Sequence, residues 1–115
     1  MEVSARLKGC RISAQKARLV ANQIRGKGVE DALNILAVSN KKFSQPLEKL
    51  VRSAVANAEQ KNETASAGID IDNLVVSRIN VDEGNSMWRI RARAQGRAAW
   101  IQKRSSHVTV VLAER

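Results

Sequence analysis

The chain has 115 residues and carries 20 lysines and arginines against 11 acidic residues, so its formal net charge is +9 at neutral pH. A surplus of this size in a small chain predicts a polyanionic partner. The single cysteine, Cys10, excludes an intrachain disulfide and a cysteine-based zinc site. Because no segment resembles a secretory signal or a membrane span, we expect one soluble domain over residues 1–115, located in the cytoplasm and without a membrane partner.

The first half of the chain is expected to form one strand and three helices. Residues 2–8 alternate between apolar and polar side chains, which is typical of a half-buried strand. Ser13 suits the N-cap of a first helix, whose apolar residues recur at helical spacing until Gly26 provides a stop. A second helix follows Gly28, and a third holds Pro46 in its first turn.

The second half is expected to form strands. The polar stretch 62–68 indicates a surface loop, a strand follows from about Asp70 to Val81, and a last strand covers His107 to Leu112. The residues expected on one face of the first of these strands are Val75, Ile79 and Val81. The order of elements predicts an α+β fold, with three helices packed on a small antiparallel sheet.

A basic stretch between the last two strands is expected to form a long protruding β-hairpin, which we call the arm, over about residues 82–104. No carboxylate occurs from Gly84 to Ala113, and Arg89, Arg91 and Arg93 would point to one side of an extended chain. An isolated two-stranded ribbon is marginal in water and like charges weaken it further, so the pattern favours an anionic partner around the arm. The alternative is a flexible basic loop without a particular partner.

Basic residues are concentrated at the two ends of the chain. Residues 1–27 carry seven basic side chains against one acidic side chain, whereas residues 28–83 carry six against nine. If the two ends lie together, they form one basic face whose guanidinium groups are suited to phosphate.

Several motifs in the chain resemble one known family. They are Ile12–Ala21, Ile24–Lys27, Ser39–Lys42, Ser53–Glu59, Val81–Gly84, Arg91–Arg97 and Lys103–Val110. In this order they resemble the bacterial-type L twenty-two family of large-subunit ribosomal proteins, over nearly the whole chain.

The resemblance implies a structural constituent of the large ribosomal subunit that binds large-subunit ribosomal RNA and neighbouring ribosomal proteins and supports subunit assembly. It also implies that the arm lines the nascent-peptide exit tunnel, with the nascent polypeptide as a further partner. The residues expected to bind ribosomal RNA are Arg6, Lys8, Arg11, Lys16, Arg18, Arg25, Lys27, Lys41, Lys42, Arg89, Arg91, Arg93, Arg97, Lys103 and Arg104. The residues expected at the tip of the hairpin are Met87, Trp88, Arg89, Ile90 and Arg91.

The chain departs from the family pattern on the arm. Proline is usual at the positions of Asn85 and Ala92, lysine is usual at those of Trp88 and Gln95, and Trp100 is unexpected. The two tryptophans are the residues of the arm that could stack on unpaired bases.

Other functions are less consistent with the sequence. An enzyme is disfavoured because His107, the only histidine, has no cysteine or carboxylate cluster beside it in sequence, and we expect no catalytic residue, metal or cofactor. A free-standing basic protein that binds RNA or DNA is the alternative, since it would share the charge but not the ordered motifs. A membrane-active peptide is the weakest option, because the arm alternates instead of forming an amphipathic helix.

Overall fold

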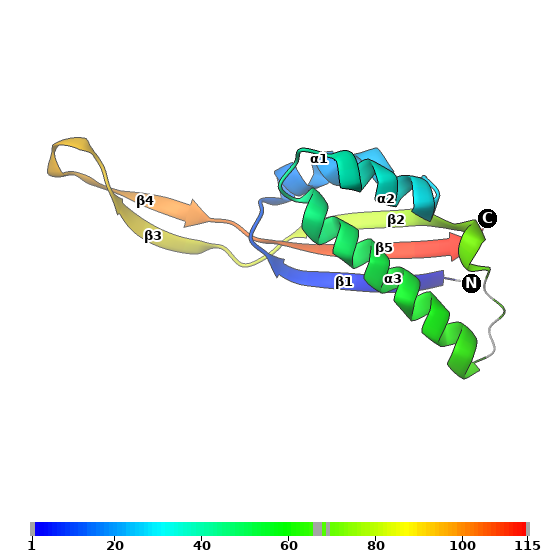
Figure 1. Ribbon diagram of the computed structural model, residues 1–115. Coiled ribbons are helices and arrows are strands. Elements are labelled where there is room, and N and C mark those ends of the chain that lie inside the picture. Colours follow the sequence, from blue (N-terminus) through cyan, green and yellow to red (C-terminus); the bar gives the residue numbers. More distant parts are fainter. Residues whose placement is uncertain (1, 66–67, 69, 115) are drawn as a thin grey trace.

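The computed structural model describes residues 2–65, 68 and 70–114 and confirms the predicted α+β class (Figure 1). Its elements, in chain order, are β1 (Glu2–Cys10), α1 (Ala14–Ile24), α2 (Val29–Val38), α3 (Ser44–Ala65), a 3-10 turn (Ile71–Asn73), β2 (Leu74–Glu83), β3 (Met87–Ala92), a 3-10 turn (Ala94–Gly96), β4 (Ala98–Lys103) and β5 (Ser106–Glu114).

β1, β5 and β2 form an antiparallel sheet in that order, with the last strand of the chain in the centre. The three helices cover one face of this sheet, α3 lying over β1 and β5, and α1 over β2 (Figure 1). The core between the two layers is aliphatic, and Phe43 is the one aromatic side chain among its described residues. β3 and β4 form a separate two-stranded sheet that extends away from the end of the body opposite to both chain termini (Figure 1).

Helix α1 follows the local signals in its sequence. The Ser13 hydroxyl accepts a hydrogen bond from the backbone N–H of Lys16 at 3.5 Å, which confirms the predicted N-cap. The predicted apolar stripe is buried along the whole helix, down to Ile24. Gly26 then adopts a positive φ of 79°, a conformation that a glycine reaches without steric cost and that turns the chain toward α2.

Strand β2 contains a bulge that corrects one predicted face. Val76 pairs with Leu112 and Arg78 with Val111, so Ser77 is an extra residue without a partner across the ladder. Because one extra residue reverses the alternation, Val76 and Ile79 share the buried face and Val75 does not. The prediction of Ile79 and Val81 on the core face is confirmed, and that of Val75 is wrong.

Helix α3 is longer than its sequence suggests. Pro46 is its third residue, within the first turn as predicted, where the missing N–H has no helical acceptor to lose. The helix continues through Ala65, so the predicted loop does not include residues 62–65. Residues 66 and 67 of that stretch lie outside the described residues. Glu63 and Thr64 are exposed, so the polar composition here reflects the surface of a helix.

The molecule is elongated by the two-stranded extension. Its principal extents are 64 × 27 × 16 Å, and its radius of gyration is 17.4 Å. A compact chain of this length has a radius of gyration of about 13 Å. The body alone therefore contains the hydrophobic core, and the extension is a projection with little of its own to bury.

The position of the core predicts which apolar substitutions destabilise the protein. Leu47 on α3 is fully buried, so Leu47→Ala is expected to lower the free energy of unfolding by roughly 2–5 kcal/mol. Val38 at the end of α2 is 81% exposed, and Val38→Ala is expected to change it by less than about 0.5 kcal/mol. Urea denaturation followed by circular dichroism measures both. Equal losses for the two variants would contradict this assignment of the core.

Candidate nucleic-acid interface

The arm joins the body through a short irregular joint, residues 84–86 and 104–105. The backbone N–H of Gly84 donates to the carbonyl of Ser105 at 2.9 Å, and the Ser105 hydroxyl donates to the carbonyl of Asn85 at 2.6 Å. A Cβ on Gly84 would lie 2.6 Å from the Ser105 hydroxyl, so any other residue at this position would displace that hydroxyl. Beyond the joint, β3 and β4 pair from Met87 opposite Lys103 to Ala92 opposite Ala98.

The tip of the hairpin lies farther along the chain than predicted. Residues 93–97 make the turn, with the N–H of Arg93 donating to the carbonyl of Arg97 at 2.6 Å. Gln95 and Gly96 have positive φ values of 62° and 72°. The predicted tip, Met87, Trp88, Arg89, Ile90 and Arg91, is therefore wrong in position: these residues form the β3 limb, and Met87 is at its base.

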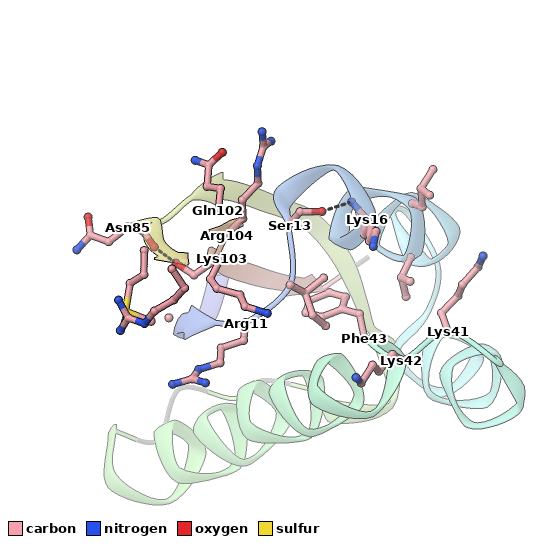
Figure 2. A pocket seen from close by; sticks show the side chains of 17 residues that line it. Arg11, Ser13, Lys16, Lys41, Lys42, Phe43, Asn85, Gln102, Lys103 and Arg104 are labelled. Atoms are coloured by element: carbon pink, nitrogen blue, oxygen red, sulfur yellow. Dashed lines mark hydrogen bonds between the residues drawn. The ribbon is translucent and has the colours of Figure 1, made fainter. Parts of the chain in front are cut away.

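A broad basic cleft lies between the joint, the start of α1 and the start of α3. Its volume is about 1230 Å³, and no carboxylate lines it. Figure 2 shows residues from these segments, far apart in sequence, around one hollow. The predicted RNA-binding residues that line it are Arg11, Lys16, Lys41, Lys42, Arg89, Lys103 and Arg104. Cations from both basic ends of the chain thus line one hollow, with the link between α2 and α3 added to them.

Charge alone did not identify every residue of the basic cleft. Ser13, Asn85 and Gln102 add neutral hydrogen-bonding groups to its lining. Leu19 also lines it and is 57% exposed, although it belongs to an amphipathic helix. The sequence contains a signal for this residue. Leu19 lies outside the apolar stripe of α1, and a leucine on the polar side of a helix does not pack into the core.

Two predicted RNA-binding arginines instead contact the open edge of the sheet. β2 is an edge strand, and its outward carbonyls need donors. Arg18 donates to the carbonyl of Val81 at 2.9 Å, and Arg25 donates to that of Ile79 at 2.7 Å. The backbone N–H of Gly26 donates to the carbonyl of Val76 at 2.9 Å. Helix α1 and the turn after it therefore cover this edge.

The other predicted RNA-binding residues lie outside the basic cleft. Arg6 and Lys8 are on exposed positions of β1, on the side of the sheet that the helices leave open. Lys27 follows the turn after α1, where its carbonyl accepts from the N–H of Val76 at 2.9 Å. Arg91 lies along β3, and Arg93 and Arg97 flank the turn at the tip.

The potentially reactive side chains, His107 and Cys10, lie in the surroundings of structural residues. The N–H of Gly9 donates to Nδ1 of His107 at 2.9 Å, which ties β1 to β5 near the joint. Burial raises the pKa of the Cys10 thiol, partly offset by a backbone hydrogen bond at Ile12, so the thiol is mostly protonated at neutral pH. Among the described residues there is no group of three or more side chains suited to a metal, and no helix long and apolar enough to cross a membrane.

The close approach at the joint predicts the effect of Gly84→Ala. The added methyl group displaces the Ser105 hydroxyl and breaks its bond to the carbonyl of Asn85. We expect ¹⁵N relaxation to report increased mobility of residues 84–86 and 104–105, with the body unchanged except at His107, whose ring the methyl group also approaches at 3.1 Å. Ser53→Ala, at an exposed position of α3, is the control. A joint as rigid as that of the unaltered protein would show that these contacts do not hold it.

The covered edge of β2 predicts a stability effect for Arg18. Arg18→Ala leaves the carbonyl of Val81 without its side-chain donor and is expected to lower the free energy of unfolding by about 1 kcal/mol. Lys16→Ala, on an exposed position of the same helix, is expected to leave it unchanged. Chemical denaturation compares the two, and equal stabilities would show that the Arg18 contact does not stabilise the fold.

Comparison with known proteins agrees with this geometry. The family model described as ribosomal protein L22p/L17e matches residues 5–113 of the chain, including the whole arm and every segment that lines the basic cleft. Proteins of this family are cytoplasmic ribosome components with a structural role, and the family is not one of enzymes. The chain therefore belongs to the ribosomal protein L22p/L17e family and is a structural constituent of the large ribosomal subunit.

Proposed function

We propose that the protein binds large-subunit ribosomal RNA chiefly through the basic cleft, and that it supports assembly of the subunit by holding RNA segments there. The observation that carries this proposal is the convergence of seven cationic side chains from four separate segments of the chain on one hollow without a carboxylate. A cleft of one sign of charge concentrates a polyanion, and among the described residues neither ion pair involves a cation of the cleft.

The contacts in the basic cleft are directed mainly to phosphate and sugar. Arginine donates to phosphate in a fork, while lysine supplies a flexible point charge, and neither needs to read a base edge. The N-terminus of α1 lies beside the cleft at Ser13 and adds the positive end of the helix dipole. Shape and charge, with little sequence readout, therefore set the affinity.

The arm extends this interface beyond the body. Arg89 and Lys103 belong to both the basic cleft and the arm, so the cations of the two are continuous. We propose that the arm lines the nascent-peptide exit tunnel, with residues 93–97 as its innermost part and the nascent polypeptide passing it. Residues 1–115 then act as one domain, and the surface of the body contacts neighbouring ribosomal proteins.

The predicted cations outside the basic cleft have secondary roles in this proposal. Arg91, Arg93 and Arg97 contact RNA along the arm, and Arg6, Lys8 and Lys27 contact segments that pass around the body. A guanidinium group has five N–H donors, and Arg18 and Arg25 each use one nitrogen on a carbonyl of β2. Their remaining donors also bind RNA in this proposal.

Binding of the isolated protein to a large-subunit ribosomal RNA fragment tests the proposal. The affinity is expected to fall steeply with salt, and Arg11→Ala is expected to weaken it and to reduce the magnitude of the salt slope by about one. Arg52→Ala is the matched control, because Arg52 lies on α3 away from the basic cleft and pairs with Glu48 at 2.8 Å.

Two results would contradict the proposal: a nearly salt-independent affinity, or equal losses for the Arg11 and Arg52 variants. Co-sedimentation separates the ribosomal role from that of a free-standing RNA-binding protein. The protein is expected to remain with the large subunit after a high-salt wash.

A further inference from the structure

The two faces of the arm have different chemistry. Residues directly opposite each other in an antiparallel pair share a face, and Ile90 is opposite Trp100. Trp88 lies two residues before Ile90 and therefore points to the same side. We call Trp88, Ile90 and Trp100 the aromatic face. The other side of the ribbon carries Arg89, Arg91 and Lys103 and is its cationic face.

The cationic face contributes residues to the basic cleft, so it already has a proposed role. The three residues of the aromatic face have none. Arg89 and Lys103 line the cleft, whereas Trp88, Ile90 and Trp100 do not. The three apolar side chains are 56%, 62% and 66% exposed, and none belongs to the core cluster. Three large apolar side chains, adjacent on one narrow ribbon, indicate a surface that another molecule covers.

The charge around the aromatic face restricts what can cover it. The arm and its joint carry Arg89, Arg91, Arg93, Arg97, Lys103 and Arg104, and the chain has no carboxylate from Gly84 to Ala113. A second copy of the arm would bring an equal set of cations into contact, which like-charge repulsion opposes. The suitable occupant is flat and apolar where it meets the rings and anionic close by. An unpaired nucleotide has both properties in one residue.

We propose that the aromatic face is a base-stacking site for unpaired nucleotides of large-subunit RNA. Bases contact the rings of Trp88 and Trp100, and their phosphates are attracted by the arginines of the turn and of the cationic face, which include Arg91, Arg93 and Arg97. The two tryptophans are diagonal neighbours across the ladder, about 7–8 Å apart, so one strand contacts both. This inference rests on the proposed RNA-binding function and adds a second, chemically different contact to it.

The composition of the chain provides a selective measurement. Trp88 and Trp100 are its only tryptophans and it has no tyrosine, so tryptophan emission reports on the aromatic face alone. The probes are an unstructured oligoadenylate and an abasic oligomer of the same length, which has the phosphates without the bases. We expect oligoadenylate to quench the emission strongly. The abasic oligomer is expected to bind through the cations and to leave the emission near its free value.

Variants on the two faces separate stacking from charge. Trp100→Ala is expected to weaken oligoadenylate binding about 5- to 150-fold and to leave abasic binding unchanged. Trp100→Phe is expected to recover most of the loss, because a smaller ring still stacks. Arg91→Gln, on the opposite face, is expected to weaken both oligomers by the same factor. Val38→Ala, an exposed apolar position on α2, is the control and changes neither.

Specific results would overturn the stacking proposal. They are equal quenching by the two oligomers, binding of oligoadenylate without quenching, or an equal loss of both oligomers in Trp100→Ala. Quenching by an apolar peptide but not by oligoadenylate would assign the aromatic face to a protein partner and would also overturn it. If large-subunit RNA binds with the expected salt dependence in those cases, only stacking fails. If that RNA does not bind, the proposed function fails as well.

Discussion

The central position of β5 in the sheet determines how the interface is assembled. The strand pairs with β1 on one side and with β2 on the other, so the first and last strands of the chain are neighbours. Cys10 at the end of β1 lies opposite Ser106, the residue that follows the arm. The basic segment after β1 therefore lies beside the basic root of the arm. These two basic regions repel each other. The backbone pairing of the strands and the aliphatic packing of the core hold them together, because their stabilising free energy outweighs the repulsion.

Local patterns predicted the elements that depend on local interactions. The alternation of residues 2–8 and the stripe of α1 are periodic, and Ser13 and Gly26 mark the ends of the helix by their own hydrogen bonding and backbone geometry. The bulge at Ser77 has no such signal, because it depends on how β2 fits against β5. The sequence placed the turn of the arm too early for a similar reason. Gln95 has a positive φ like Gly96, and because glutamine seldom adopts a positive φ, its presence does not signal a turn.

The roles of individual cations could not be separated from sequence. Arg18 and Lys16 occur two residues apart on one helix and carry the same charge. One donates to an edge carbonyl of β2 and the other lines the basic cleft, because they point in different directions around the helix axis. A count of basic residues predicts the class of partner, and only the packing of α1 against β2 shows which guanidinium groups also have a structural acceptor.

The joint links the basic cleft to the direction of the arm. Its described backbone and hydroxyl contacts are few, and the arm has no core that would fix its orientation to the body. Asn85, Lys103, Arg104 and Ser105 line the cleft, so a phosphate bound there, as proposed, would contact the joint itself. If RNA binds as proposed, RNA in the cleft favours one orientation of the arm, and an arm held by RNA at its far end favours that same orientation. By thermodynamic linkage the two contacts strengthen each other, since each offsets part of the ordering that the other requires.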